Sequence, residues 1–271
     1  MTGATMARIN KIKQIWKSGK ASLNGWLHIP SSWSAEVMAH QGYDSLVVDL
    51  QHGLMNYETA VPMLQAISTT DVTPMARAPW NEPGIIMKLL DAGAYGIICP
   101  MINTREECER FVGACRYFPD GYRSLGPTRA KIYAGADYAK HANQEVITMA
   151  MIETAEAVAN AEEIITVPGL DAIYIGPGDL SLTIGSEQRV DNTDPLYLAE
   201  IDKVLAVCAK HGVIAGLHCN DPAYARQMIE RGFQFVTVMS DTGLLGTAAK
   251  QAVTAVRTGQ DNSTEYPDSA Y

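Results

Sequence analysis

Residues 146–179 read VITMAMIETAEAVANAEEIITVPGLDAIYIGPGD, and this stretch decides the fold. The apolar runs at 146–152 and 172–175 have the length and composition of buried strands. Between them, residues 155–165 carry apolar side chains at helical spacing. A strand, a helix and a second strand in this order predict one unit of a parallel α/β sheet.

The same alternation runs along the chain. Strands are predicted at 23–29, 45–50, 73–77, 96–100, 146–152, 172–175, 213–218 and 235–239. Helices are predicted at 34–41, 57–68, 83–91, 104–116, 155–165, 195–210, 221–231 and 243–257, with an additional helix at 6–17. Eight such units predict a single (β/α)8 TIM barrel domain over residues 1–257. An open, doubly wound sheet is the alternative, although no G-x-G-x-x-G follows the first strand.

Local signals mark several boundaries. Ser34 is a candidate N-cap, and Thr104 with Glu107 has the spacing of a capping box. Glycines at 42, 93, 212 and 232 each follow a predicted helix, as a C-terminal cap requires. Residues 117–145 form a long insertion, which is typical of functional or mobile loops. Residues 258–271 are polar, and we expect a disordered tail.

The composition excludes several classes of protein. The chain has 271 residues, 30 acidic and 21 basic, and a net charge of −9. This balance argues against binding of nucleic acid or an anionic membrane. No apolar run is long enough for a membrane span, and the N-terminus lacks the apolar segment of a signal peptide. Five cysteines without C-x-x-C spacing argue against a disulfide framework or a zinc cage, so we expect a cytoplasmic protein.

The active face of such a barrel lies at the C-terminal ends of its strands. Glu153 and Asp179 end two adjacent predicted strands. Two carboxylates in one pocket repel each other unless a proton or a cation lies between them, and their oxygens suit Mg²⁺ or Mn²⁺ better than zinc. The alternative is that each carboxylate caps the helix that follows it.

Further strand ends carry an arginine and two histidines. Arg77 either forms a structural ion pair or binds an anion. His52 is a candidate general base, and His218 is the competing histidine. In the turn from Gly176 to Asp179, backbone N–H groups can hold a carboxylate or a phosphate, although an ordinary turn is equally compatible with this sequence.

Two absences restrict the chemistry. A Schiff-base aldolase needs a lysine on a barrel strand, and all ten lysines lie outside the predicted strands. The turns after the seventh and eighth strands lack a glycine-rich phosphate grip, which disfavours a phosphorylated substrate.

A series of short motifs resembles the HpcH/HpaI aldolase family. The motifs are SAE (34–36), VDLQHG (48–53), RAPWN (77–81), LLDAGA (89–94), PM (100–101), RYFPDGYRS (116–124), IET (152–154) and IGPGDLS (175–181). The resemblance implies a metal-dependent, class II aldolase that cleaves a 4-hydroxy-2-oxo acid to an aldehyde and pyruvate or hydroxypyruvate. It also implies a hexamer, a trimer of dimers, whose C-terminal helix is exchanged between subunits.

The resemblance assigns roles to individual residues. Glu153 and Asp179 would hold the divalent cation (Mg²⁺, Mn²⁺ or Co²⁺), and the backbone N–H groups of Gly178 and Asp179 would hold the carboxylate. Arg77 would stabilise the enolate oxygen, and His52 would be the acid/base residue. By the same resemblance Asp91 would raise the basicity of His52, and Trp26 would lie near the substrate. Asp49 is a further catalytic candidate, and Met151 and Arg129 are further candidates for substrate binding.

The sequence departs from the family pattern at two positions. Gln51 stands where many members have glutamate, and Met151 where many have a substrate-contacting glutamine. Gln51 removes one charge beside His52, and Met151 removes one hydrogen bond to the substrate. Neither change deletes a metal ligand, so we expect an active enzyme. The segment 120–137, with Arg123, Arg129 and Lys131, would face the aldehyde, or these basic groups are simply solvated.

Two rival functions remain open at this point. One is a CoA-ester lyase of the citrate-lyase β type, for which no nucleotide groove is evident in the sequence. The other is a catalytically inactive barrel that acts as a binding or assembly protein, against which the set of Glu153, Asp179, Arg77 and His52 argues.

Overall fold

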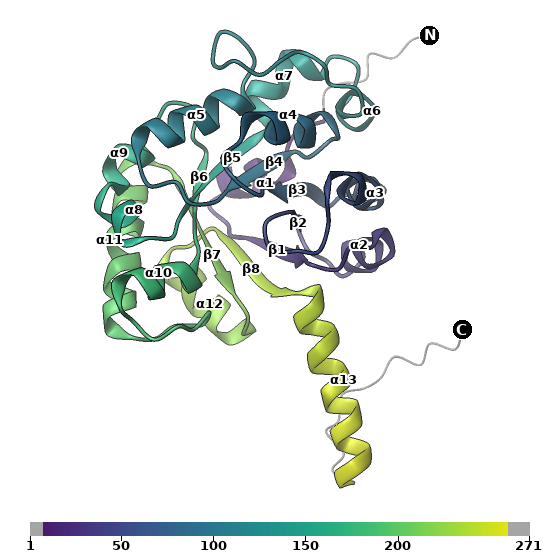
Figure 1. The fold of residues 1–271 in the computed structure, drawn as a ribbon, viewed down its shortest axis with the longest axis vertical. Coiled ribbons are helices and arrows are strands. Elements are labelled where there is room, and N and C mark those ends of the chain that lie inside the picture. Colours follow the sequence, from purple (N-terminus) through teal and green to yellow (C-terminus); the bar gives the residue numbers. More distant parts are fainter. Residues whose placement is uncertain (1–7, 260–271) are drawn as a thin grey trace.

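The computed structural model describes residues 8–259. Eight parallel strands form a closed barrel in which each strand pairs with the next and β8 pairs with β1 (Figure 1). This confirms the (β/α)8 barrel and excludes the doubly wound alternative. The strands are β1 (Ser22–Leu27), β2 (Ser45–Asp49), β3 (Thr73–Arg77), β4 (Gly96–Cys99), β5 (Ile147–Ile152), β6 (Ala172–Ile175), β7 (Ile214–Cys219) and β8 (Phe235–Ser240).

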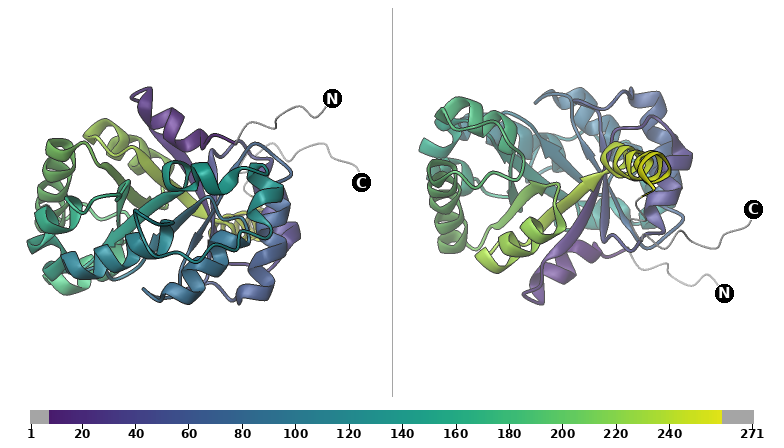
Figure 2. Two further views of the ribbon diagram at one scale, coloured as in Figure 1. Left: turned by 90° about the horizontal axis from the view of Figure 1, so that it is seen from above. Right: turned by 90° about the horizontal axis from the view of Figure 1, so that it is seen from below.

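Helices lie around the outside of the barrel between successive strands, except α1, which precedes β1, and α13, which follows β8 (Figure 2). They are α1 (Lys11–Lys17), α2 (Ser32–Ala39), α3 (Tyr57–Ile67), α4 (Pro83–Asp91), α5 (Arg105–Cys115), α6 (Ala130–Ala134), α7 (Tyr138–Glu145), α8 (Ala155–Ala159), α9 (Ala161–Ile165), α10 (Pro177–Ile184), α11 (Pro195–His211), α12 (Pro222–Arg231) and α13 (Asp241–Thr258). No described helix is both long enough and apolar enough to cross a membrane.

The predicted helix caps are confirmed at five positions and wrong at one. The capping box of Thr104 and Glu107 is present, and the four predicted cap glycines all have positive φ. The N-cap at Ser34 is wrong, because Ser31 caps α2 and its hydroxyl accepts a hydrogen bond from the Ser34 N–H. The predicted helix at 155–165 is divided at Asn160 into α8 and α9.

Three predicted segments need adjustment. The insertion at 117–145 is not a plain loop, because it contains α6 and α7. The predicted helix at 6–17 begins only at Lys11, and its residues 6 and 7 lie outside the described residues. The predicted tail begins inside α13, which extends to Thr258, and residues 260–271 also lie outside the described part of the chain.

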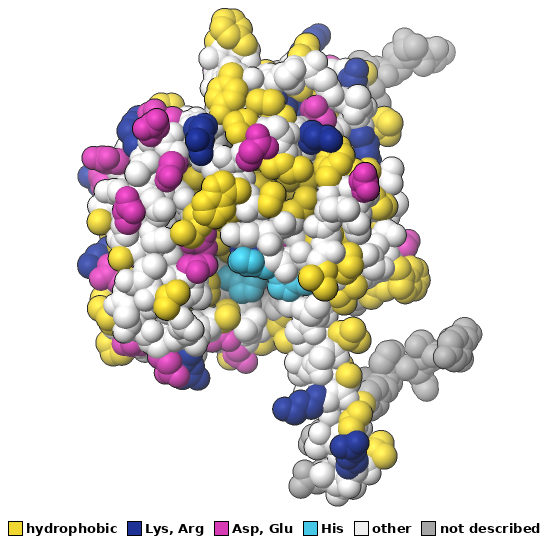
Figure 3. Space-filling model, in the orientation of Figure 1, with side chains coloured by type: hydrophobic (Ala, Val, Ile, Leu, Met, Phe, Trp, Pro, Cys, Tyr) yellow, Lys and Arg dark blue, Asp and Glu magenta, His cyan; other side chains and the backbone are white. Residues whose placement is uncertain are grey.

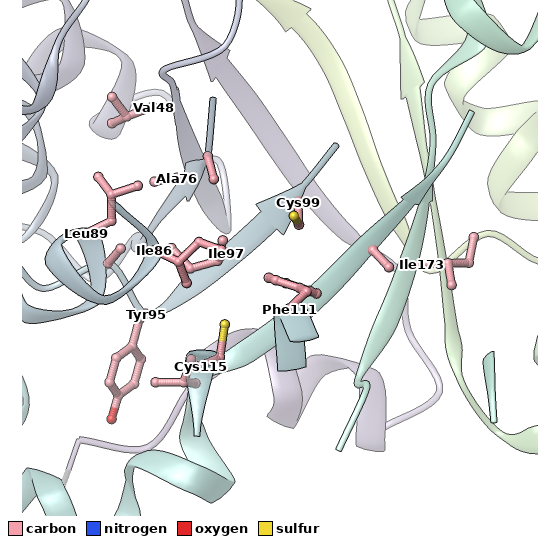
Figure 4. Packing of buried hydrophobic residues seen from close by; sticks show 14 of the residues in the cluster. Val48, Ala76, Ile86, Leu89, Tyr95, Ile97, Cys99, Phe111, Cys115 and Ile173 are labelled. Atoms are coloured by element: carbon pink, nitrogen blue, oxygen red, sulfur yellow. The ribbon is translucent and has the colours of Figure 1, made fainter. Parts of the chain in front are cut away.

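The apolar side chains form two cores. The inner one fills the barrel, and α1 closes its N-terminal end with Ile12 and Trp16. The outer core lies between strands and helices, where Ile86 and Leu89 of α4 and Phe111 of α5 pack towards the barrel wall (Figure 4). Because one end is closed, only the C-terminal ends of the strands can open into a site.

The last helix does not cover the barrel. Apart from its first residues, α13 extends away from the other elements (Figures 1 and 2). Its base is fixed by Asp241, whose carboxylate accepts hydrogen bonds from the N–H groups of His28 and Ile29 and from the Ser34 hydroxyl. Beyond this base, Leu245, Val253 and Val256 are 63%, 50% and 87% exposed.

Candidate active site

A cavity of about 490 Å³ opens at the C-terminal ends of the strands. Histidine side chains gather in the hollow seen at the centre of the face in Figure 3. The cavity is lined by Trp26, His28, His52, Arg77, Met151, Glu153, Tyr174, Gly176, Pro177, Gly178, Asp179, Leu182, Gln188, Arg189, Val190 and His218. The expectation that the site lies at the C-terminal ends of the strands therefore located more than half of the wall, with residues from the ends of five strands or the turns that follow them.

Arg77 is held by Asp49 beneath the cavity. Its Nε donates to Asp49 Oδ1 at 2.8 Å and its Nη2 donates to Oδ2 at 2.6 Å, so the pair is bidentate. Asp49 is 0% exposed. Burial alone would raise the pKa of Asp49, but hydrogen bonds from His28 and Arg77 hold this pKa well below its usual range. Asp49 is a positioning residue that supports Arg77 and does not line the cavity.

Two further side chains complete the surroundings of Asp49. Trp26 Nε1 and His28 Nε2 each lie 3.1 Å from Asp49 Oδ2. The guanidinium of Arg77 also lies over the Trp26 ring, 4.9 Å from its centroid. Since Nε and Nη2 of Arg77 bond Asp49, Nη1 is left facing Met151 Sδ at 4.0 Å, in the wall of the cavity.

Glu153 and Asp179 lie in the same cavity. Glu153 is 2% exposed, and its Oε1 accepts a hydrogen bond of 2.7 Å from the N–H of Met101. Met101 has φ 55°, in the left-handed region that residues other than glycine rarely adopt. A Cβ at Gly176 would lie 2.3 Å from Glu153 Oε2, so only glycine leaves room for the second oxygen.

The buried Glu153 carboxylate is destabilised as an anion, and a bound cation would stabilise it. The pKa of Glu153 is raised to about 7, mainly by burial; the Met101 N–H and Arg77 oppose this shift, and the charge of Asp179 adds to it. The capping alternative fails for Glu153, because Thr154 caps α8. Gly176 stands at the N-cap of α10, and Asp179 lies inside its first turn. The Asp179 carboxylate has no hydrogen bond within residues 8–259, so its oxygens are free for a ligand.

The donor set fits a hard divalent cation. Two carboxylates in one cavity, one of them buried and destabilised as an anion, suit Mg²⁺ or Mn²⁺. Within the described residues no three His, Cys, Asp or Glu groups cluster as ligands. A cation here would have two protein ligands, with its other positions left to substrate and water.

The turn after β6 is the start of a helix. α10 begins at Pro177, which needs no N–H partner, and the predicted turn residues Gly178 and Asp179 occupy its first turn. The first N–H groups of a helix lack intrahelical acceptors, and the helix dipole favours an anion beside them. The carboxylate of a ligand in the cavity could therefore accept hydrogen bonds from the backbone N–H groups of Gly178 and Asp179.

The two candidate histidines differ in their surroundings. His52 is exposed at the cavity, and its ring makes no hydrogen bond within residues 8–259. His218 Nδ1 lies 3.0 Å from the Tyr174 hydroxyl. Burial, with the nearby charges of Arg77 and His28, lowers the pKa of His218 to about 3, so its imidazole is neutral. His52 is thus the better candidate for proton transfer.

The basic insertion lies at the other end of the barrel, contrary to the expectation that it faces the aldehyde within one chain. Arg129 donates to the Ala92 carbonyl and the Ser68 hydroxyl, at the ends of α4 and α3. Arg123 pairs with Asp91 at 2.7 Å. The physical reason is topological, because a segment that follows a helix returns to the N-terminal ends of the strands. Asp91, Arg123, Arg129 and Lys131 do not line the cavity.

The sequence reasoning missed several wall residues. His28 lies just beyond β1 and should have appeared among the strand-end residues, because the same rule applies to the first strand. Tyr174 carries an inward-facing hydroxyl inside a strand that was interpreted only as apolar. The segment Gln188–Val190 lies in the connection between α10 and α11 and carried no motif.

Comparison with known proteins assigns the chain to a family. A sequence model described as HpcH/HpaI aldolase/citrate lyase matches residues 25–248. The chain belongs to this family. A hydroxypyruvate/pyruvate aldolase of Rhizorhabdus wittichii is 40% identical over 92% of this chain and 99% of its own. A 4-hydroxy-2-oxo-heptane-1,7-dioate aldolase of Shigella flexneri is 34% identical over 94% and 95%.

Solved structures agree with this assignment. A family member from Burkholderia cenocepacia matches with a TM-score of 0.86 and 31% identity, and the alignment covers 92% of this chain and all of the other. The resemblance inferred from the motifs is confirmed, as is the barrel.

Proposed function

We propose that the chain is a divalent-metal-dependent aldolase. It cleaves a 4-hydroxy-2-oxo acid reversibly to pyruvate, or a close 2-oxo acid such as hydroxypyruvate, and an aldehyde. The observation that carries the proposal is the shared cavity of Glu153, Asp179 and Arg77, with a free helix N-terminus beside them. The aldolase relatives at 40% and 34% identity support the same reaction class.

Each group has a role in the cleavage. The amides of Gly178 and Asp179 bind the carboxylate of the 2-oxo acid, and Nη1 of Arg77 stabilises negative charge that develops on the C2 oxygen. A divalent cation held by Glu153 and Asp179 supplies Lewis-acid stabilisation of that charge when it is bound. Asp49 fixes the guanidinium plane, so Arg77 needs little reorganisation during the reaction.

His52 is proposed to move the proton. In the cleavage direction its ring takes the proton of the C4 hydroxyl, the C3–C4 bond breaks, and the electron pair passes to the enolate. Asp91 lies at the end of α4, paired with Arg123. Within one chain Asp91 is too far from the cavity to act on His52. We therefore propose that Asp91 raises the basicity of His52 of a neighbouring subunit.

The direct test is cleavage of a 4-hydroxy-2-oxo acid by the protein loaded with Mg²⁺, Mn²⁺ or Co²⁺ after treatment with EDTA. We expect metal-dependent release of a 2-oxo acid, and a fall in kcat of about 10²-fold or more in His52→Gln. A folded, metal-loaded protein that releases no 2-oxo acid but binds CoA tightly would favour the CoA-ester lyase. No specific observation in the cavity favours that rival.

We also propose an oligomer in which α13 is exchanged between subunits. A groove of about 260 Å³ lies between α12 and the end of α2, lined by Leu23, Tyr43, Ile229 and Val238 among others. In a (β/α)8 barrel the helix after β8 would cover this place, but α13 extends away from it. The exposed apolar side chains of α13 suit such a groove on a second copy, and hexamer formation follows from the family resemblance.

The assembly can be tested on the apolar face of α13. The double variant Val253→Asp, Val256→Asp places two charges where an apolar groove is expected, so we predict dissociation to smaller species. Light scattering coupled to size-exclusion chromatography measures the mass. The matched control is Thr247→Asp, Thr254→Asp, which adds the same charge to polar positions of the same helix. Equal masses for both variants and the wild type would contradict the exchange.

The cytoplasmic location stays a prediction from the sequence. The five cysteines are buried and unpaired in the described structure, so none is available at the surface.

A further inference from the structure

A chain of hydrogen bonds crosses the floor of the cavity, and the proposed reaction uses none of it. It runs from Asn24 of β1 to Thr237 of β8 (2.9 Å), on to Tyr174 of β6 (2.6 Å), and ends at Nδ1 of His218 in β7 (3.0 Å). Asn24, Tyr174 and Thr237 are fully buried. A polar chain in the interior of a barrel costs desolvation free energy, so its geometry calls for an explanation.

The chemistry of the donors gives the chain one direction. The Asn24 Oδ1 accepts from the Ser45 hydroxyl at 2.8 Å, which leaves the amide nitrogen to bond Thr237. An amide nitrogen only donates, so Thr237 Oγ1 accepts there and gives its own hydrogen to Tyr174. The Tyr174 hydroxyl then donates onward, to His218 Nδ1.

This direction sets the tautomer of His218. A neutral imidazole that accepts at Nδ1 carries its hydrogen on Nε2. Within residues 8–259 nothing hydrogen-bonds Nε2, and the ring lines the cavity. The ring is held edge-on against Trp26, with centroids 5.1 Å apart, and Trp26 is stacked on Tyr174. The cavity therefore contains a fixed, neutral N–H donor among aromatic rings.

The other polar groups of a 2-oxo acid already have partners. In the proposed function its carboxylate binds at the start of α10, and its C2 oxygen is stabilised by Arg77 and would be stabilised by a divalent cation held by Glu153 and Asp179. The methyl group of pyruvate cannot accept a hydrogen bond and would leave the Nε2 donor unpaired, whereas a hydroxyl on C3 can accept it. A ligand bound in the cavity would shield the half-buried His218 ring from water, so the site discriminates against a ligand that leaves this N–H donor unpaired.

We propose that His218 is a specificity residue that donates a hydrogen bond from Nε2 to the C3 hydroxyl of a 3-hydroxy-2-oxo acid donor. Tyr174 and Thr237 are positioning residues that keep its ring in this tautomer. The inference rests on the proposed aldolase function and names the 2-oxo acid that the site prefers, one with a hydroxyl on C3.

The test compares two donors in the Mg²⁺-loaded enzyme. Exchange of C3 protons for deuterium is followed by NMR with hydroxypyruvate and with pyruvate, and the ratio of the two kcat/KM values is the readout. His218→Phe keeps an aromatic ring but has no donor, so we expect the ratio to shift towards pyruvate by about tenfold. Tyr197→Phe is the matched control, because its buried hydroxyl has no hydrogen-bond partner within residues 8–259 and lies outside the cavity. Its ratio should stay that of the wild type.

The positioning role has its own readout. Nitrogen-15 spectra of histidine-labelled protein report which ring nitrogen carries the hydrogen. We expect the Nε2–H form of His218 in the wild type, and a mixture of tautomers together with a reduced ratio in Tyr174→Phe. An Nδ1–H form in the wild type would overturn the inference without any variant.

The remaining outcomes separate the two proposals. An unchanged ratio in His218→Phe, or an equal loss for both donors, would overturn the specificity role while leaving the aldolase intact. A wild-type enzyme that exchanges neither donor would instead overturn the proposed function.

Discussion

Arg77→Met is expected to lower kcat by about 10²- to 10³-fold, because it removes the charge that faces the developing enolate oxygen. It should also destabilise the fold. Asp49 is fully buried and relies on the bidentate pair with Arg77, so the variant leaves an uncompensated carboxylate in the interior. Losing one partner of a buried pair costs about 3–5 kcal/mol. Urea unfolding at equal protein concentrations measures this loss.

A double variant separates the two effects of Arg77. Asp49→Asn combined with Arg77→Met removes both charges, and Trp26 and His28 still face a polar side chain at position 49. We expect most of the lost stability to return while kcat stays low. If the double variant is as unstable as Arg77→Met alone, the buried charge is not the cause of the destabilisation.

Glu153→Gln is expected to abolish metal-dependent activity, with a loss of about 10³-fold or more, because one of two carboxylate ligands disappears. The substitution is nearly isosteric, and the amide oxygen can still accept from the Met101 N–H. The activity loss should therefore occur in a folded protein. Glu156→Gln, on the exposed first turn of α8, is the matched control and should behave as the wild type.

The same variant should be more stable than the metal-free wild type at pH 8. Burial raises the pKa of Glu153 from its ordinary 4.5 to about 7, so the folded state binds a proton more tightly than the unfolded state. The stability of the wild type therefore falls as pH rises from about 4.5 to 7, and the cost above pH 7 is about 3 kcal/mol.

Urea unfolding in EDTA at pH 8 and pH 4.5 tests this dependence. The advantage of Glu153→Gln should be present at pH 8 and vanish near pH 4.5, where the carboxyl group is protonated in both states. A variant less stable than the wild type at pH 8 would show that the carboxylate is not strained by burial.

The barrel was predictable because its signal repeats. Each apolar run followed by a helical pattern adds the same evidence, and the unit at 146–179 occurs as β5, α8, α9 and β6. Errors arose where one residue pattern has two structural meanings. The Gly-Pro-Gly run was interpreted as a turn, although proline in the first turn and glycine at the cap also start a helix, as in α10.

The site was predictable where the strand-end rule applied. It located His52, Arg77, Glu153, Asp179 and His218, which all line the cavity. The resemblance named Asp91 and the basic segment 120–137 suggested Arg129, but neither carried information about where these residues lie in the barrel. Both follow or end a helix, so the fold puts them at the opposite end from the cavity.

The hydrogen-bond networks were not predictable from the sequence. Asp49 is surrounded by Trp26 of β1, His28 just beyond β1, and Arg77 of β3, and no spacing rule relates these positions. Such contacts depend on the barrel register, which pairs Asp49 with Arg77 and Trp26 with Val47.

The most direct test of the central claim is exchange of the C3 protons of pyruvate and hydroxypyruvate for deuterium, followed by NMR. The protein is stripped with EDTA and then given Mg²⁺, Mn²⁺ or Co²⁺ in turn. We predict exchange of at least one donor that requires the metal and disappears in Glu153→Gln, but not in Glu156→Gln. A folded protein that binds the metal and exchanges neither donor with any of the three cations would contradict the account.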